Sequence, residues 1–417
     1  MLKKVHFIGI GGAGMAPLAS MLLECNTIVT GSDSASNNKT IYLSKKGATI
    51  YYNHCSNNVP IDTELVVYSS AIKEDNPELV IAKQLNIPCI RRGEFLAQFA
   101  NNYKRKVAIS GSHGKSSITA MLVWITKQAN YNCGYLIGAD FNDQTPSSSI
   151  GKNFDIFICE ADESDATHTL LKNTIGIVPN FDFDHLWTVG GSEQLKKNFI
   201  TFANNSNKII YYNFDILQNL FNTHKDAITL PIPLNKDTFD IWYGFQATNA
   251  RLAVTAAVQL GIDEKDAITL LRTFPGIGRR MVTKYSSNDL IIVEDYAHHP
   301  TEVASSIEFL RSKYPNYTLK ILFQPHRFAR LEEFFDGFAN ELKKADIAFI
   351  TPVFAAWSET GKVNSNDLAK ACNGIAVTGS WEEVAKEVIK DNPPKTVLAI
   401  LGAGDINQVF NYLPKNK

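Results

Sequence analysis

Residues 106–122 read KVAISGSHGKSSITAML, which is an apolar strand, a turn rich in glycine and a segment of helical character. Gly114-Lys115-Ser116 matches the end of a phosphate-binding P-loop, but Ile109 stands where that motif has its first glycine, so the loop is shorter. We expect backbone N–H groups and the Lys115 ammonium to hold β- and γ-phosphates, and the Ser116 hydroxyl to face Mg²⁺.

Acidic residues follow the next apolar strand of the same block. The strand DIFIC ends at Cys159 and is followed by EADESD, which contains Glu160, Asp162, Glu163 and Asp165. A third strand, TIGIVPN, precedes FDFDH, which adds Asp184 and His185. Carboxyl ends of parallel strands meet at one sheet edge, so we predict an ATP site with a magnesium carboxylate there. Which acidic residue binds the metal is left open, and the alternative is a solvated acidic loop.

A second glycine turn lies near the start of the chain, in HFIGIGGAGM (residues 6–15). Gly9, Gly11 and Gly14 form GxGxxG after a strand, and Asp33 closes the next strand about 20 residues on. The pattern favours a nucleotide diphosphate at a helix N-terminus with a carboxylate for ribose hydroxyls. Both an NAD-dependent dehydrogenase and a UDP-binding protein satisfy it, and a merely structural turn is the third interpretation.

The order of segments predicts an α/β protein with parallel sheets. Strand and helix patterns alternate in three blocks, which restart at Arg105 and at Asp289. A chain of 417 residues is too long for one core, so we expect three domains, with polar linkers at residues 101–104 and after Arg280.

Composition narrows the class of partner. The chain is 45% apolar and 20% charged, with a net charge of −1, which favours small-molecule substrates over nucleic acid or a membrane surface. Six cysteines without a CxxC pair suggest neither a disulfide framework nor zinc, which fits the cytoplasm. No segment approaches the roughly 20 apolar residues of a membrane span, so we expect no membrane insertion.

The motifs together resemble one family, the ATP-dependent Mur ligases of peptidoglycan synthesis. The resemblance covers nearly the whole chain and rests on HFIGIGGAGM, VVYSSAIKEDNPE, SGSHGKSSITAM, EADESD, GIGRRM, EDYAHHPTEV, FQPHRFAR and LGAGDI, in the family's order. It implies a Rossmann-like UDP-sugar domain at residues 1–103, a shortened P-loop-type ATPase domain with a parallel sheet at 104–281, and a Rossmann-like amino-acid domain at 282–417. It also implies ATP and Mg²⁺, with UDP-N-acetylmuramate and L-alanine as substrates, in a monomer or homodimer.

The resemblance assigns roles to particular residues. Catalytic residues would be Lys115, His185, His326 and Arg327. ATP would be bound by Gly111, Ser112, His113, Gly114, Lys115, Ser116, Ser117, Asn249, Arg280 and Asp295. Substrates would be bound by Gly11, Gly12, Ala13, Gly14, Asp33, Ser69, Ser70, Arg92, Glu163, His326, Arg327 and Arg330. The metal would be held by Ser116, Glu160 and His185, where His185 would be a minority type of ligand.

The chain also departs from the family. Phe245-Gln246 replaces the usual His-Asn before Asn249, Trp187 replaces a small or acidic residue, and Ser116-Ser117 replaces Thr-Thr. The segment between KIIYYNFD and QATNA is short, so the central domain looks trimmed, and VFAAWSETG departs from the family after VFAA. Alternatives are a ligase that recycles a tripeptide, which FQPHRFAR disfavours, glycine or serine as the amino acid, the NAD-dependent dehydrogenase, and a binding protein without catalysis.

Overall fold

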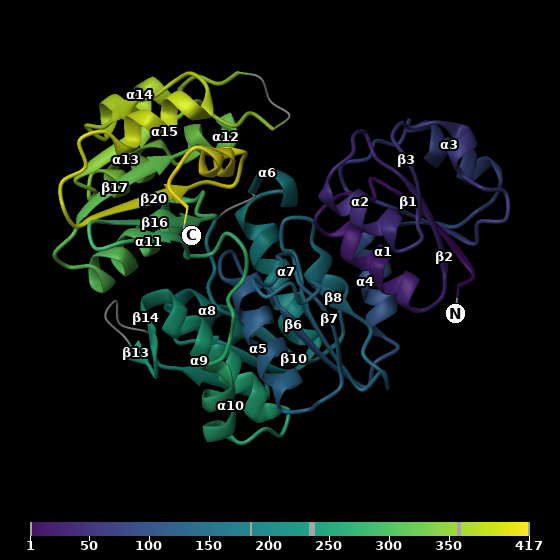
Figure 1. Cartoon of the computed structure of the whole chain (residues 1–417). Helices are drawn as coiled ribbons and strands as arrows, with labels where there is room; N and C mark the ends of the chain where they lie inside the picture. The colour runs from purple at the N-terminus through teal and green to yellow at the C-terminus, as the bar shows by residue number, and fades with distance from the viewer. Residues whose placement is uncertain (1, 184–185, 233–237, 357–359, 416–417) are drawn as a thin grey trace. The chain divides into compact units, whose positions relative to one another are not determined.

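The computed structural model describes residues 2–183, 186–232, 238–356 and 360–415. It has an α/β fold with three main sheets dominated by parallel strands, which confirms the predicted fold class (Figure 1). The chain divides into two compact units, Met1–Pro233 with Asn249–Pro275 (unit 1) and Leu234–Thr248 with Gly276–Lys417 (unit 2). In the described part of the chain, no helix has both the length and the apolar character needed to cross a membrane.

The first sheet of unit 1 is entirely parallel, with strand order β3-β2-β1-β4-β5. Its strands and helices are β1 (Lys4–Ile8), α1 (Met15–Glu24), β2 (Ile28–Ser32), α2 (Asn38–Lys45), β3 (Thr49–Tyr51), β4 (Leu65–Tyr68), α3 (Pro77–Gln84), β5 (Cys89–Arg91) and α4 (Arg92–Ala100). Side chains alternate along β1, so Val5 and Phe7 join a core with α1 and α4, whereas Ile8 packs with Leu79 of α3. β1 lies between β2 and β4, so the first glycine turn leaves β1 where the strand order reverses, a place where ligands bind such sheets.

The second sheet of unit 1 has the order β12-β11-β10-β6-β9-β7-β8, and β8 alone runs antiparallel to its neighbour. Its strands are β6 (Arg105–Ile109), β7 (Cys133–Leu136), β8 (Ser148–Ser149), β9 (Ile156–Glu160), β10 (Asn173–Val178), β11 (Ser206–Tyr212) and β12 (Ala227–Leu230). Its helices are α5 (Lys115–Gln128), α6 (Leu186–Val189), α7 (Ser192–Asn204), α8 (Asp215–Phe221) and α10 (Glu264–Leu271). β6 pairs with both β9 and β10, so the glycine loop, the acidic segment and the segment after β10 all leave the same edge.

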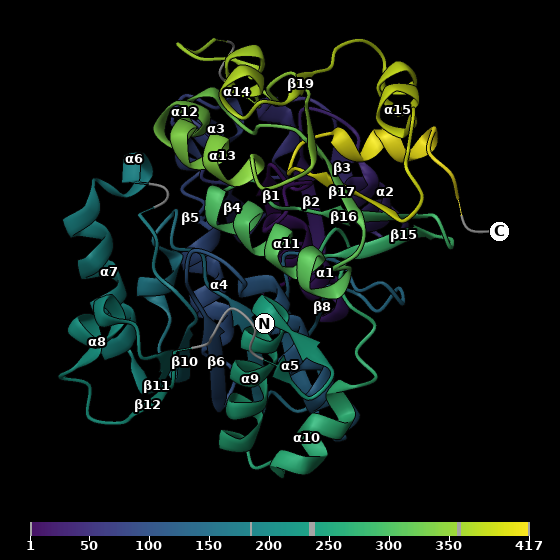
Figure 2. The same ribbon diagram turned by 90° about the vertical axis from the view of Figure 1, so that its left-hand side faces the viewer.

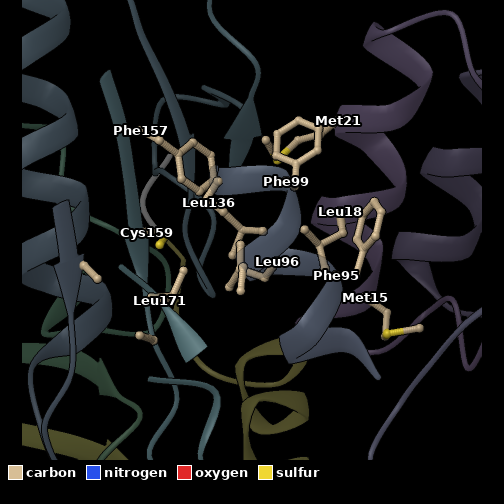
Figure 3. Packing of buried hydrophobic residues seen from close by; sticks show 14 of the residues in the cluster. Met15, Leu18, Met21, Phe95, Leu96, Phe99, Leu136, Phe157, Cys159 and Leu171 are labelled. Atoms are coloured by element: carbon tan, nitrogen blue, oxygen red, sulfur yellow. The ribbon is translucent and has the colours of Figure 1, made fainter. Parts of the chain in front are cut away.

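Helix α4 is shared by the cores of both sheets in unit 1. The Phe95 ring meets Phe7 of the first sheet edge-on, with centroids 6.1 Å apart, and the Phe99 ring meets Phe157 of the second sheet at 6.1 Å. Figure 3 shows Phe95, Phe99 and Phe157 with Leu18 and Met21 of α1 and with Leu136 of β7. Apolar burial on both sides of α4 therefore fixes the first sheet against the second.

The sheet of unit 2 has the order β15-β16-β20-β17-β18-β19, with β15 antiparallel to β16. Its elements are β15 (Val282–Ser286), β16 (Leu290–Asp295), α11 (Pro300–Lys313), β17 (Thr318–Phe323), α12 (Phe328–Glu333), α13 (Phe335–Leu342), β18 (Ile347–Ile350), α14 (Ser365–Ala371), β19 (Ile375–Ala376), α15 (Trp381–Ile389) and β20 (Thr396–Leu401). One face packs on α11, α13 and α14, and α11 and α13 lie side by side there (Figure 2). The opposite face packs on α15.

The described residues between β12 and QATNA form a two-stranded hairpin. Its strands are β13 (Thr238–Phe239) and β14 (Trp242–Tyr243), and α9 (Gly244–Gln259) follows directly. Phe245 begins this helix and its ring packs against Phe309, with centroids 5.8 Å apart. Phe245 therefore has a packing role in unit 2.

Candidate functional site

The loop between β6 and α5 has the backbone of a phosphate cradle. Gly114 caps α5 in the left-handed conformation, with φ +85°, which glycine adopts readily. A Cβ on Gly114 would lie 2.8 Å from Oδ1 of Asn249, so the Asn249 side chain lies against the loop. The N–H groups of the first turn of α5, which carries Ser117, have no partner within the helix and suit an anion.

Lys115 folds back over this loop. Its Nζ donates to the carbonyl oxygen of Gly111 at 2.6 Å and pairs with Glu163, whose Oε2 is 2.8 Å away. Glu163 is only 2% exposed. Burial raises the pKa of the Glu163 carboxyl to about 7, although the Lys115 charge opposes this shift. Lys115 is therefore placed over the loop by a partly ionised carboxyl group that a phosphate group could replace.

Ser116 and Glu160 form the oxygen pair predicted for a metal. The Ser116 hydroxyl donates to Oε2 of Glu160 at 2.9 Å, and the other Glu160 oxygen accepts the Gly138 N–H. Burial raises the pKa of Glu160, so a cation beside it would favour its charged form. A hydroxyl and a carboxylate suit the preference of Mg²⁺ for oxygen. The other predicted ligand, His185, lies outside the described residues, as does Asp184.

Two residues that the sequence did not single out as site residues hold the loop from the segment after β10. The Asn180 side chain accepts the His113 N–H at 2.8 Å and donates to the His113 carbonyl at 3.1 Å. Asp182 pairs with the His113 ring at 2.7 Å, and its N–H donates to the Ser112 hydroxyl at 2.8 Å. His113 and Ser112 therefore fix the loop to the neighbouring strand. Asn180 ends TIGIVPN and Asp182 lies just after it, which was the available signal.

The first glycine turn is held by the end of β2. The N–H groups of Gly9 and Ile10 both donate to the Ser32 carbonyl, at 2.8 and 2.9 Å, and Asp33 Oδ2 accepts the Gly11 N–H at 2.8 Å. Gly12 and Ala13 are exposed at the tip of the turn, as a backbone that meets a diphosphate should be. Ser69 and Ser70 follow β4; Ser69 lies against Gly9, and Ser70 is exposed.

Arg92, the first residue of α4, lies against the same turn. A Cβ on Gly14 would come within 2.7 Å of Nη1 of Arg92, so only glycine leaves room for the guanidinium. On its other side Arg92 pairs with Asp165, which connects the predicted substrate residue to the acidic segment. This pairing joins positions 73 residues apart in the chain.

In unit 2, His326, Arg327 and Arg330 are brought together at the turn after β17. The His326 ring stacks on Phe354, with centroids 5.4 Å apart and an interplanar angle of 8°, and Nη1 of the buried Arg330 is 3.5 Å from its Nδ1. Arg327 caps α12 with φ +69°, and its N–H donates to the Phe354 carbonyl at 2.8 Å. Burial, followed by the nearby charges of His298 and the arginines, lowers the pKa of His326 to about 3.

Arg280 and Asp295 are tied to their own surroundings in unit 2. Asp295 is 4% exposed; its Oδ2 accepts the Ser306 hydroxyl at 2.6 Å, and its Oδ1 accepts the Tyr296 N–H at 2.9 Å. Burial raises its pKa. Arg280 pairs with Glu302 at 3.3 Å. Both residues therefore shape the loop after β16 as well as being candidates for ATP.

Arg279 was missed by the sequence reasoning, although it adjoins Arg280. It donates to the carbonyls of Gly402 and Gly404, at 2.6 and 3.1 Å, so it holds the LGAGDI turn. His298 and His299 orient the start of α11. Nδ1 of His298 lies 3.1 Å from Oε2 of Glu302, and the His299 side chain caps the helix.

A buried polar cluster supports the first glycine turn from the opposite face of its sheet. Glu78 of α3 is fully buried and accepts hydrogen bonds from Ser32 Oγ at 2.6 Å, Asn58 Nδ2 at 2.9 Å and His6 Nε2 at 3.0 Å. Burial alone would raise the pKa of Glu78, but these hydrogen bonds outweigh it and lower the pKa. Ser32 ends β2, and its carbonyl accepts the Gly9 and Ile10 N–H groups of the turn. The Glu78 carboxylate, which accepts the Ser32 hydroxyl, therefore stabilises the strand end that holds the turn.

We expect Glu78→Gln to lower the free energy of unfolding by about 3 kcal/mol at neutral pH, because the amide cannot accept all of these donors. The folded-state pKa lies below the unfolded one, so the stabilisation is complete above the unfolded pKa, about 4.3, and is lost as pH falls through the folded value. Urea denaturation from pH 3 to pH 7 would measure the difference. Glu74→Gln, at a surface pair with Lys83, is the control, and an equal loss in both variants would contradict this account.

Comparison with known proteins supplies independent findings. Residues 4–104 match the profile described as "Mur ligase family, catalytic domain", and residues 279–404 match "Mur ligase, glutamate ligase domain". UDP-N-acetylmuramate–L-alanine ligases of Buchnera aphidicola and Persephonella marina are each 33% identical to the chain; the alignments cover 98% and 100% of this chain, and 88% and 98% of those proteins.

Solved structures agree on the fold. The UDP-N-acetylmuramate-alanine ligase of Thermotoga maritima gives a TM-score of 0.81 at 23% identity, covering 98% of both chains. A murein peptide ligase of Psychrobacter arcticus gives 0.69 at 21% identity, covering 99% of this chain and 98% of that one. At these identities the structural likeness establishes the fold alone.

Proposed function

Because this chain belongs to the Mur ligase family of ATP-dependent ligases that form carbon–nitrogen bonds, we propose that it joins L-alanine to the lactyl carboxylate of UDP-N-acetylmuramate. The observation that carries this proposal is the pair of glycine cradles in unit 1. Each leaves the carboxyl edge of its own parallel sheet, and two nucleotides, ATP and a UDP-sugar, need two cradles. The relatives that align with 98% and 100% of this chain are named UDP-N-acetylmuramate–L-alanine ligase, which is the reaction proposed here.

The proposed reaction has two steps. A carboxylate oxygen of the muramate attacks the γ-phosphorus of ATP, the bond to the β-phosphate oxygen breaks, and ADP leaves. The resulting acyl phosphate is attacked at its carbonyl carbon by the amine of L-alanine, which loses a proton, and phosphate leaves as the amide forms. Phosphoryl transfer of this kind depends on positioning and on neutralising charge more than on covalent help from the protein.

The loop after β6 supplies the groups for the first step. Lys115 would exchange Glu163 for the phosphates of ATP, and Glu163 would then be available to the substrate side of the site. Ser116 and Glu160 would hold Mg²⁺, which supplies charge neutralisation between the phosphates when bound. Asn249 on the loop would meet adenine, and Arg280 and Asp295 would also serve ATP. His185 is retained as a predicted catalytic and metal residue.

The first glycine turn and its neighbours would bind the UDP-sugar. The backbone of the turn from Gly11 to Gly14 and the Arg92 guanidinium would meet the diphosphate, with Ser69 and Ser70 nearby. Oδ2 of Asp33 accepts the Gly11 N–H of the turn, and Oδ1 would accept a ribose hydroxyl. A dehydrogenase would use the same turn, but it gives Lys115 and the acidic segment no role.

The cluster of His326, Arg327 and Arg330 would receive the amino acid and the muramoyl carboxylate. Two cationic guanidinium groups beside a neutral imidazole suit an anionic substrate that also carries an amine. We place residues 1–103 with the UDP-sugar, 104–281 with ATP and 282–417 with the amino acid. Free cysteines are typical of proteins in the reducing cytoplasm, the compartment in which both nucleotides are found, and this supports a cytoplasmic enzyme.

Oxygen transfer tests this proposal directly. UDP-N-acetylmuramate labelled with ¹⁸O in both lactyl carboxylate oxygens would be incubated with ATP, Mg²⁺, L-alanine and the protein. An acyl phosphate sends one labelled oxygen into the released phosphate and leaves the other in the amide, which mass spectrometry resolves. Unlabelled phosphate would mean that ATP is hydrolysed by water and would overturn the proposed route.

A further inference from the structure

Arg92 makes contacts in two directions, toward both predicted nucleotide sites. Its Nη2 donates to Asp165 Oδ2 at 2.5 Å and lies 3.9 Å from Asp162 Oδ2, so it binds the acidic segment that also contains Glu160 and Glu163. Its Nη1 lies against Gly14 of the first glycine turn and donates to no group in the part of the chain that the structure describes. One guanidinium therefore connects the two cradles.

The position of Arg92 is fixed by packing. The side chain is 15% exposed and begins α4, the helix held between both sheets by Phe95 and Phe99. The next residue, Gly93, is so close to Thr167 that a Cβ there would overlap the hydroxyl. The start of α4 thus lies directly against the residues that follow the acidic segment, which fixes the backbone from which the Arg92 side chain extends.

Arg92 and Lys115 contact neighbouring carboxylates of the acidic segment. Nη2 of Arg92 lies 3.9 Å from Oδ2 of Asp162. Asp162 directly precedes Glu163, the ion-pair partner of Lys115. We therefore expect a shift of the Arg92 guanidinium to move the acidic segment and, through Glu163, to change the position of the Lys115 ammonium.

We propose that Arg92 couples the two sites, so that a UDP-sugar bound at the first glycine turn tightens the binding of ATP at the second. The inference rests on the proposed function. A diphosphate would take Nη1 while Nη2 keeps Asp165, since the planar fork of arginine binds two anions at once. The fixed guanidinium then holds the acidic segment in place before ATP arrives, which lowers the ordering cost of the second ligand. Coupling between binding sites is reciprocal, so ATP tightens the UDP-sugar equally.

Binding measurements test this coupling without turnover. The Kd of the Mg²⁺ complex of a non-hydrolysable ATP analogue would be measured by calorimetry with and without saturating UDP-N-acetylmuramate. We expect the Kd of the wild type to fall by about fivefold or more when the UDP-sugar is present. In Arg92→Lys the charge is kept but the fork is lost, and the two Kd values should become equal.

Two further variants separate coupling from a general defect. In the wild type, Oδ1 of Asp165 accepts the Thr167 N–H at 3.1 Å, and Asp165→Asn can keep this hydrogen bond while it removes the ion pair with Arg92. The UDP-sugar should therefore still bind to this variant, but the coupling should be lost. Arg91→Lys, at the adjacent exposed arginine, should retain the coupling of the wild type. Coupling that persists in both Arg92→Lys and Asp165→Asn would overturn this inference alone. A wild type that binds no UDP-sugar would overturn the proposed function with it.

Discussion

Lys115→Ala is expected to lower the rate of phosphate release by about 10³-fold, while the Kd for UDP-N-acetylmuramate changes by less than about twofold. The ammonium is the one cation that the structure places directly over the loop after β6, among the described residues of unit 1, through its bonds to the Gly111 carbonyl and Glu163. Without it the charge that develops on the transferred phosphoryl group is poorly compensated. Steady-state phosphate release and calorimetry with the UDP-sugar would measure the two quantities.

The fold should tolerate this change. Burial already raises the pKa of Glu163 to about 7, so once Lys115 is gone the carboxyl can become neutral instead of remaining as a buried charge. Lys127→Ala is the matched control, because this lysine lies exposed in the last turn of the same helix. A loss of less than about tenfold in Lys115→Ala would contradict the assignment of the loop to ATP.

His326→Ala is expected to lower kcat/KM for L-alanine by about 10²-fold and to leave the KM for ATP unchanged. The ring is stacked on Phe354 and lies near Arg330, so it is a fixed polar group in the cluster assigned to the amino acid. With a pKa of about 3 it is neutral across the working range, and its protonation should produce no inflection in the pH profile between about pH 6 and 9.

The control for this variant is His224→Ala, which removes a histidine bonded to the Ser206 carbonyl in unit 1. His326→Asn, which keeps one hydrogen-bonding group, should recover part of the lost rate. If His326→Ala raised the KM for ATP as much as that for L-alanine, the cluster would have no specific role with the amino acid.

The sequence predicted the two cradles because their chemistry depends on local patterns. A glycine turn between a strand and a helix, with Lys115 and Ser116 next to it, is read directly from neighbouring letters, and parallel strands then bring Glu160 and Glu163 to the same edge. The α/β fold class followed from alternating strand and helix patterns for the same reason. The boundaries of the three functional regions remain predictions.

The supporting contacts were not predictable because they join residues that are distant in the chain. Nothing in the letters around Arg92 indicates Asp165, and nothing around His113 indicates Asp182. Similarly, Asp295 matched a motif, yet the sequence could not show that Ser306 and the Tyr296 N–H would use its oxygens. Tertiary packing determines such pairs. For the same reason the role of Arg279 could not be predicted, because its partners are backbone carbonyls of a turn that is distant in the chain.

The identity of the amine is the central claim, and phosphate release with different acceptors tests it most directly. The purified protein would receive ATP, Mg²⁺ and UDP-N-acetylmuramate with L-alanine, glycine, L-serine or L-Ala-γ-D-Glu-diaminopimelate. This account predicts that L-alanine gives the highest kcat/KM, with phosphate and the amide formed in equal amounts. Preference for the tripeptide, or no phosphate release with any of the four acceptors, would contradict it.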